Sequence, residues 1–144
     1  MEYLHKRFEE RTDPACYLPD ARAVVCVALN YHVPLESSDK PAGDVGKIAR
    51  YALGDDYHEH IKSRLHKLAD VIRHLSPDVQ TRCGVDTAPI MEKELAARAG
   101  IGWVGKHTCV INPAIGSWLM LGEVVTTLDL AVDDGVRLGD RSAR

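Results

Sequence analysis

The feature that most constrains the fold is an apolar stripe that recurs with the period of an α-helix. It consists of Tyr57, Ile61, Leu65, Leu68, Ile72 and Leu75. This spacing places the side chains on one face of a helix, which is stable only when another layer buries that face. Asp56 with Glu59 predicts the start of the helix, and Ser76 with Pro77 its end.

A sheet is the predicted second layer. Residues 23–29 read AVVCVAL, a β-branched run typical of a strand buried on both faces. Further strands are predicted at residues 79–85, 107–111 and 117–127, the last one broken at Gly122. A short helix is predicted at residues 1–11 and a longer one at 89–99, which Pro89 opens and Gly100 stops. Because helices alternate with strands, the predicted class is α/β, a mixed sheet flanked by helices.

Length and composition exclude several classes of protein. The 144 residues suit one domain, and 45% hydrophobic with 27% charged residues is ordinary globular composition. The net charge of -3 does not favour a dedicated nucleic-acid binder, and no DNA partner is predicted. No apolar run approaches the ~18 residues of a membrane span, and charges interrupt the N-terminus where a signal peptide would lie. We therefore expect a cytoplasmic protein with no membrane partner.

The cysteines and histidines do not predict a metal site within this chain. Cys16, Cys26, Cys83 and Cys109 include no C-x-x-C pair, the spacing that zinc ribbons and iron–sulfur sites use. His58 and His60 stand two positions apart on the predicted helix, so their side chains do not face each other. The prediction for metal ligands is therefore none.

The glycine-rich stretch at residues 100–105, GIGWVG, matches G-x-G-x-x-G, and Lys106 extends it toward a P-loop. Both phosphate-binding motifs need a strand before the glycines and a helix after them. The predicted order here is the reverse, and His107 replaces the P-loop hydroxyl residue. The glycines instead indicate backbone that lies close to something flat or bulky.

Asp86 is the carboxylate that the pattern singles out. It ends a predicted strand just ahead of a predicted helix, a usual place for catalytic groups in α/β folds. The same position suits an aspartate that merely caps the helix. Position alone leaves both roles open.

Four longer stretches carry a family resemblance. They read RYALGDDYH at residues 50–58, VDTAPI at 85–90, ELAARAGIGWVGKHT at 94–108 and GSWLMLGE at 116–123. In this order and spacing they resemble epoxyqueuosine reductases, the cobalamin-dependent enzymes that complete the queuosine base in tRNA. The resemblance covers roughly residues 1–130.

The resemblance implies an oxidoreductase that reduces the epoxide of epoxyqueuosine in tRNA to the alkene of queuosine. Cobalamin would carry the reaction, and two 4Fe-4S clusters in a ferredoxin-like domain would supply electrons. Asp86 matches the family's proton donor. The segments that would line the cofactor and substrate pocket contribute Arg50, Tyr57, His58, Lys106, His107, Thr108 and Ser117.

The proton-donor role requires an aspartate that keeps its proton near neutral pH, whereas the reference pKa of aspartate is about 3.9. A following helix N-terminus lowers that pKa, and burial against an apolar cofactor raises it. We expect burial to dominate once cofactor and substrate close the site.

Departures from the family pattern indicate a fragment. The family continues into two ferredoxin-type cysteine runs and begins with a further helix and strand, neither of which is in this sequence. We therefore expect residues 1–130 to form part of a nitroreductase-like cobalamin- and substrate-binding domain truncated at both ends, inactive alone. Residues 131–144 would form a disordered polar tail. The alternatives are a non-catalytic corrinoid- or nucleotide-binding module and a flavin-binding nitroreductase-like protein.

Overall fold

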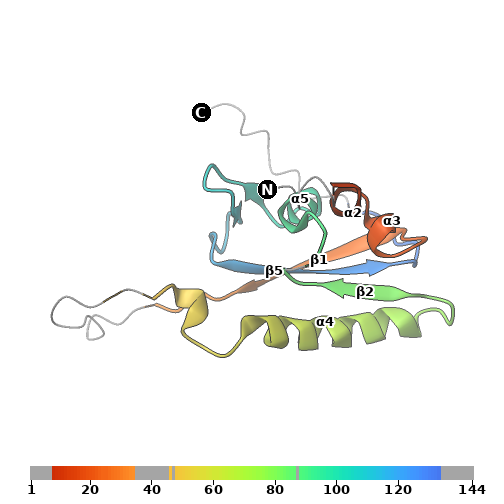
Figure 1. Ribbon diagram of the computed structural model, residues 1–144, viewed down its shortest axis with the longest axis horizontal. Helices are drawn as coiled ribbons and strands as arrows, with labels where there is room; N and C mark the ends of the chain where they lie inside the picture. The colour runs from red at the N-terminus through yellow and green to blue at the C-terminus, as the bar shows by residue number, and fades with distance from the viewer. Residues whose placement is uncertain (1–7, 35–45, 47, 87, 134–144) are drawn as a thin grey trace.

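A computed structural model describes residues 8–34, 46, 48–86 and 88–133, which form three layers (Figure 1). A twisted sheet forms the middle layer. The long helix α4 (Tyr57–His74) covers one face of the sheet, and α2 (Phe8–Thr12), α3 (Pro14–Tyr17) and α5 (Glu92–Arg98) lie on the other. The α/β prediction is confirmed.

The central sheet has three described strands in the order β1-β5-β2, all antiparallel to their neighbours, and is not the mixed sheet that was predicted. The strands are β1 (Ala23–Asn30), β5 (Leu119–Thr126) and β2 (Thr81–Gly84). Because β5 runs against both neighbours, β1 and β2 finish at the end where β5 begins. We call this the site end of the sheet, since the polar cluster described below lies there.

The predicted apolar stripe packs α4 onto the sheet, except for Leu75, which lies at the C-cap of the helix and is exposed. Asp56 caps the helix by accepting a hydrogen bond from the backbone N–H of His58 (2.9 Å). Ile61, Leu65 and Ile72 are buried against Val124 of β5. Gly122 does not break β5 as predicted: it pairs with Val27, and its missing side chain makes room for α4. A Cβ atom there would lie 3.0 Å from a methyl group of Leu65.

The opposite face of the sheet buries a smaller core of Tyr17, Leu18, Ile90 and Val125. The Tyr17 hydroxyl donates to the carbonyl of Cys83 (2.7 Å), and the Arg82 guanidinium stacks on the Tyr17 ring at 4.1 Å from its centroid. This face also buries Glu123, which is 1% exposed. The two faces therefore differ in kind, one apolar and one partly polar.

The prediction of a sheet strand at residues 107–111 is wrong. A strand covers only β4 (Val110–Ile111), which pairs with β3 (Trp103–Val104) in a separate two-stranded sheet. Thr108 has a φ of 66°, which ends the extended backbone on its N-terminal side. Gly102 packs against the backbone of Ile111, where a Cβ atom would overlap the Ile111 carbonyl. Gly102 therefore makes its close backbone contact within the β3–β4 hairpin of this chain.

The second helix also begins later than predicted. It starts at Glu92, and residues 88–90 form a turn in which the N–H of Ile90 bonds the carbonyl of Ala88 (2.8 Å). The buried Ile90 side chain anchors this turn in the core. Met91, without a side-chain hydrogen bond, occupies the N-cap position, so Asp86 does not cap the helix. Gly100 ends it with a φ of 78°, as predicted.

Two predictions fall wholly or partly outside the described residues. Residues 1–7 of the helix predicted at residues 1–11 lie outside the described residues. The described part of this segment forms α2 (Phe8–Thr12). The predicted tail lies outside from residue 134 onward. Within the described part of the chain, no helix is long and apolar enough to cross a membrane.

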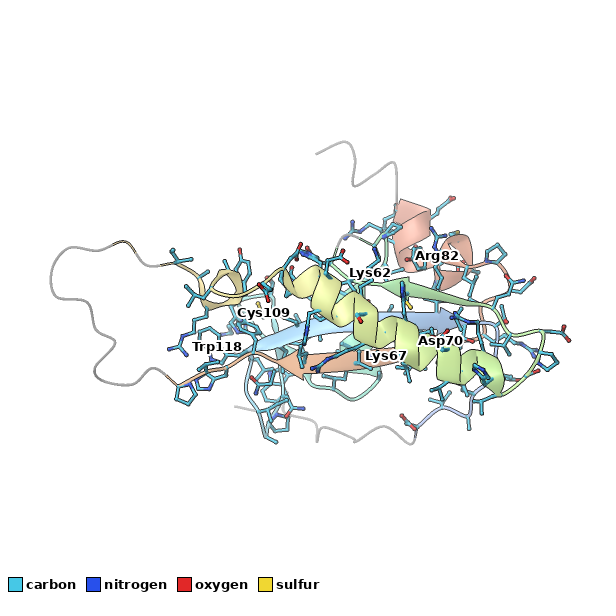
Figure 2. All side chains as sticks on the ribbon, turned by 90° about the horizontal axis from the view of Figure 1, so that it is seen from below. Lys62, Lys67, Asp70, Arg82, Cys109 and Trp118 are labelled. Atoms are coloured by element: carbon cyan, nitrogen blue, oxygen red, sulfur yellow. The ribbon has the colours of Figure 1, made fainter. Side chains whose placement is uncertain are left out.

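Figure 2 shows Lys62, Lys67 and Asp70 along the outer face of α4.

Candidate active site

Asp86 lies at the site end of the sheet, two residues after β2 finishes at Gly84. Its φ of 43° is a left-handed conformation that non-glycine residues seldom adopt. Its side chain is 53% exposed. The carboxylate faces His58 at the start of α4.

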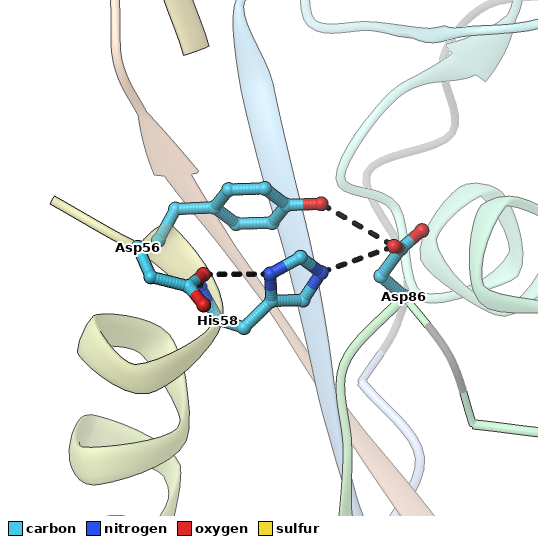
Figure 3. Close-up of polar contacts among 4 residues, drawn as sticks. Asp56, His58 and Asp86 are labelled. Atoms are coloured by element: carbon cyan, nitrogen blue, oxygen red, sulfur yellow. Dashed lines mark hydrogen bonds and ion pairs between the residues drawn. The ribbon is translucent and has the colours of Figure 1, made fainter. Parts of the chain in front are cut away.

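The imidazole of His58 bridges two carboxylates (Figure 3). Its Nδ1 lies 2.7 Å from Oδ1 of Asp56, and its Nε2 lies 3.1 Å from Oδ2 of Asp86. The first carboxylate caps α4 and the second follows β2. The imidazole therefore links the helix N-terminus to the Asp86 loop.

The two carboxylates raise the pKa of His58, Asp86 by the larger effect and Asp56 next. His58 lies in the first turn of α4, where the helix dipole disfavours a cation. The raised pKa means that the two carboxylates outweigh the partial desolvation of the ring. In return, the hydrogen bonds from the backbone and side chain of His58 lower the pKa of Asp56. The site thus places beside Asp86 an imidazole whose protonated form is favoured.

Tyr57 adds an aromatic wall and a second hydrogen bond to Asp86. Its hydroxyl donates to Oδ2 of Asp86 (3.3 Å), and its ring stacks on His58 with centroids 3.9 Å apart. Burial and then the Asp86 carboxylate raise the pKa of Tyr57. The phenol therefore remains a donor and fixes the same oxygen that faces the imidazole.

Asp86 borders two cavities. One, of about 190 Å³, includes Tyr31, Tyr51, Tyr57 and Cys109 in its lining. The other, of about 380 Å³, is lined partly by α2 and by the start of α5, including Phe8, Arg11 and Met91. Glu92 and Lys93 line both cavities. A ligand in either cavity would have the Asp86 carboxylate within its reach.

A second aromatic group lies beside the first cavity, where β5 begins. Trp118 packs edge-on against Tyr31 at 5.6 Å between centroids, and the Arg50 guanidinium lies 5.0 Å from the centre of the Trp118 ring. Arg50 also donates to the carbonyl of Val33 (2.6 Å). Figure 2 shows Trp118 and Cys109 at the site end of the sheet. An exposed platform of this kind suits a flat ligand.

The structure brings together some of the predicted site residues and separates others. Tyr57, His58 and Asp86 form one hydrogen-bonded cluster. Arg50 contacts the ring of Trp118, the residue that follows the half-buried Ser117. The remaining three are exposed on the turn between β3 and β4, and none of the described contacts joins them to Asp86: Lys106, His107 and Thr108. All of these roles remain predictions.

Sequence reasoning missed two acidic residues behind Asp86. Glu92 lines both cavities, and burial and then the charge of Asp86 raise its pKa. Glu123 lies deeper in the same face of the sheet. A signal for Glu123 was present, because it is the single charged residue within the predicted strand 117–127.

The fold and site together define an α/β domain with an aspartate–histidine cluster beside aromatic-lined cavities. Residues 11–87 match the family model described as "Epoxyqueuosine reductase QueG, DUF1730". This match covers more than half of the sequence, and the chain belongs to the epoxyqueuosine reductase family.

Curated relatives agree with this assignment. The chain is 49% identical to the epoxyqueuosine reductase of Synechocystis over 116 residues, which is 81% of this chain and 39% of the relative. It is 42% identical to that of Gloeobacter violaceus over 134 residues, 93% of this chain and 40% of the relative. The chain thus spans about two fifths of the length of these relatives. Both relatives are reductases by name.

Solved structures show the same fold. The epoxyqueuosine reductase of Streptococcus thermophilus superposes with a TM-score of 0.81 at 31% identity, over 94% of this chain and 42% of that one. A second epoxyqueuosine reductase was solved with an epoxyqueuosine-modified tRNA stem loop. It superposes with a TM-score of 0.79 at 31% identity, over 87% of this chain and 34% of that one. The Bacillus subtilis enzyme was solved with its catalytic aspartate loop swung out of the active site. It superposes with a TM-score of 0.80 at 28% identity, over 95% of this chain and 37% of that one.

Proposed function

We propose that this chain is part of an epoxyqueuosine reductase that reduces the epoxide of epoxyqueuosine in tRNA to the alkene of queuosine, with Asp86 as proton donor. The observation that carries the proposal is the cluster at Asp86, where one carboxylate oxygen faces both an imidazole and a phenol. Family membership supports it, as does the relative solved with an epoxyqueuosine-modified stem loop.

The reaction requires two electrons and two protons, because the epoxide oxygen leaves as water. Asp86 is the exposed acid at the cavities, and it would donate to that oxygen as the C–O bond breaks. His58, whose pKa is raised, would return a proton to Asp86 across the 3.1 Å contact. The hydrogen bond from Tyr57 would keep the carboxylate in position.

The left-handed backbone conformation of Asp86 supports a loop that adopts two alternative positions. The Bacillus subtilis relative was solved with its catalytic aspartate loop swung out of the active site. In the present structure the Asp86 loop is instead held toward α4 by His58 and Tyr57. We propose that these two side chains select the position from which Asp86 reaches substrate.

Cobalamin is the proposed cofactor, and the residues at the site end fit part of it. Tyr31, Tyr51 and Tyr57 supply flat apolar walls, and Arg50 and Ser117 lie beside the Trp118 platform. The turn that carries Lys106, His107 and Thr108 offers donors suited to amide side chains on a corrin edge. The 190 Å³ cavity is smaller than typical ligand pockets of ~300–1,000 Å³, so it would admit an edge of the ring and not enclose it. When bound, cobalamin would supply the reductive chemistry.

The remaining parts of the proposal follow from the resemblance. Residues 1–130 would form part of the cofactor- and substrate-binding domain, and electrons would come from two 4Fe-4S clusters. No group of three or more His, Cys, Asp or Glu side chains suited to a metal ion occurs in the described ranges. The cluster ligands would therefore come from elsewhere in the enzyme, and tRNA as substrate makes the cytoplasm the proposed location.

The decisive experiment is Asp86→Asn in a full-length reductase that contains this sequence. The variant keeps the shape of the side chain, so cofactor binding and the corrin absorption spectrum should not change, whereas turnover of epoxyqueuosine should fall by ~10²–10⁴-fold. Reduction at close to the parent rate would overturn the proton-donor role. A flavin spectrum in place of a corrin spectrum would favour the nitroreductase-like alternative.

A second readout does not depend on turnover. In the 144-residue chain, Asp86→Asn should lower the pKa of His58 toward its ordinary value of 6.5, followed by NMR of the imidazole. Asp55→Asn is the matched control, because the exposed Asp55 lies next to the cluster and has no described contact with His58. An unchanged His58 titration in Asp86→Asn would contradict the coupling shown in Figure 3.

A further inference from the structure

A third cavity lies beside the start of α4, and the proposed function does not use it. Its volume is about 480 Å³, larger than either cavity that borders Asp86. The lysine and arginine in its lining are Lys62 of α4 and Arg82 of β2, which Figure 2 shows on these neighbouring elements. We call it the Lys62–Arg82 cavity. In a chain of net charge -3, two cations that line one cavity favour an anionic ligand.

The chain holds Arg82 in place without neutralising it. Its guanidinium lies 4.1 Å from the centre of the Tyr17 ring, and Nη1 donates a hydrogen bond to the Tyr17 carbonyl (2.5 Å). Neither contact is with an acid, and no ion pair of Arg82 occurs among the described residues. The remaining N–H groups can therefore bind a ligand. A planar guanidinium donates two parallel hydrogen bonds to a phosphate, which makes phosphate the anion that this arginine suits.

Lys62 adds a second positive charge. Its side chain is exposed, and in the described part of the chain it has no ion pair, not even with Glu59, the acid in the lining. His58 also lines the cavity, but its two ring nitrogens already contact Asp56 and Asp86. The imidazole can therefore contribute charge there, and the hydrogen bonds to a ligand would come from Lys62 and Arg82.

The Lys62–Arg82 cavity adjoins the loop of Asp86. Val85, Ala88 and Pro89 line it, and these residues flank Asp86 in the sequence. His58 connects the cavity to the site, because its Nε2 lies 3.1 Å from Oδ2 of Asp86. An RNA whose modified base reaches Asp86 must bring the phosphates on either side of that nucleotide to the same end of the sheet.

We propose that the Lys62–Arg82 cavity binds a backbone phosphate of the substrate tRNA, next to the epoxyqueuosine nucleotide. This rests on the proposed function, which makes tRNA the substrate. Phosphate contacts set the position of a nucleic acid on a protein without reading its sequence. A phosphate held by Lys62 and Arg82 would thus place the modified nucleotide relative to Asp86.

The first test measures binding of an epoxyqueuosine-modified tRNA stem loop to a full-length reductase that contains this sequence. Lys62→Gln should weaken binding by ~10-fold at low salt and should reduce the salt dependence of log K by ~1. Lys67→Gln is the matched control, because it removes the same charge from an exposed position of α4 that does not line the cavity. Equal losses for the two lysines would overturn the proposal, since only the overall charge of the helix would then matter.

The second test identifies the phosphate. Stem loops are made with a single neutral methylphosphonate at each position near the modified nucleotide. At one position the substitution should weaken binding to the parent enzyme but have little further effect on Lys62→Gln. Arg82→Gln should lose sensitivity at the same position. Losses that add at every position would overturn the proposal.

Folding does not confound these tests. Arg82→Gln also removes the contact with Tyr17, so its thermal unfolding is measured alongside binding. Lys62→Gln changes an exposed side chain without a described partner, and its result stands alone if Arg82→Gln unfolds. If Lys62→Gln lowers the thermal stability of the full-length enzyme and leaves RNA binding unchanged, an acidic segment of the enzyme occupies the cavity, and the proposal is overturned.

Free phosphate is the other source of the same chemistry. Inorganic phosphate, added at constant ionic strength, should weaken binding of the stem loop to the parent enzyme more than to Lys62→Gln. If inorganic phosphate binds in a Lys62-dependent manner and Lys62→Gln does not change RNA affinity, the cavity binds a free anion, which overturns the proposal.

Steady-state kinetics separates this inference from the proposed function. Lys62→Gln should raise the stem-loop concentration for half-maximal turnover by the same ~10-fold and leave kcat unchanged, because the phosphate contact is equal in ground and transition states. Asp86→Asn should do the reverse. Normal turnover by Asp86→Asn would overturn the proton-donor role and leave the phosphate site standing. Unchanged RNA affinity in Lys62→Gln would overturn the phosphate site alone.

Discussion

The two faces of the central sheet bury different kinds of side chain. The α4 face is closed by an 18-residue helix over Ile61, Leu65 and Ile72, and its core consists of apolar side chains. The α5 face is covered by short helices and carries Glu123, the Tyr17–Arg82 contact and the loop of Asp86. The larger apolar core lies on one face, and the buried acid Glu123 lies on the other. A strand such as β5 can serve both because its residues alternate between them.

The largest effect should come from the apolar face. Leu65→Ala should lower the free energy of unfolding by about 4–5 kcal/mol, the upper part of the range for such truncations. Leu65 is 1% exposed and fits against the backbone at Gly122, so the cavity has little room to collapse. Denaturant unfolding of the 144-residue chain measures the loss.

Leu75→Ala is the matched control on the same helix. Leu75 is 65% exposed, so its truncation should change stability by less than about 0.5 kcal/mol. Equal losses for the two leucines would mean that α4 is not docked as described.

The next effect concerns the polar face and depends on pH. The pKa of Glu123 is raised in the folded chain to about 8, so its neutral form favours folding at low pH. That contribution is complete below its unfolded pKa of 4.5 and is lost as the pH rises through about 8. At 1.36 kcal/mol per unit, the loss between pH 4.5 and 7 is about 3 kcal/mol.

Glu123→Gln should remove this dependence, because the amide does not titrate. Unfolding free energies of the two proteins, measured from pH 5 to pH 8, should converge at the acidic end and separate at the basic end in favour of the variant. Parallel curves would contradict a raised pKa and would make the two faces more alike than the structure indicates.

The smallest effect isolates one hydrogen bond on the polar face. Tyr17→Phe removes the donor to the carbonyl of Cys83 but keeps the ring beneath Arg82. The expected loss is about 1 kcal/mol, typical of one hydrogen bond. Tyr51→Phe, on a residue that is 52% exposed, should change the free energy of unfolding much less. A large loss at Tyr17 would show that this face contributes more stability than its small core suggests.

The apolar face was predictable from the sequence, and the polar face largely was not. Period alone identifies the buried side of α4, because Ile61, Leu65 and Ile72 follow the helical repeat. The sequence also pointed to Asp86. Its surroundings depend on long-range geometry, because His58 contacts Asp86 across 28 positions of sequence while also contacting the nearby Asp56. No local sequence pattern encodes that contact.

The errors have local physical causes. The helix was predicted to start near Pro89 because proline favours a first turn, yet burial of Ile90 holds that segment in a different turn. The strand predicted at residues 107–111 was shortened by the left-handed Thr108. Gly122 was interpreted as a break, whereas its small size is what lets α4 approach β5.

The antiparallel order β1-β5-β2 has a consequence for synthesis on the ribosome. Ala23 and Thr81 both face Thr126, so every described pairing in the central sheet involves β5, which follows β1 and β2 in the sequence. Strands made early must wait unpaired until β5 emerges, and closing such a long loop before any pairing makes folding slow. During that interval the apolar run of β1 is open to association with other nascent chains. The strand order therefore predicts an interval in which β1 is exposed, before β5 is made.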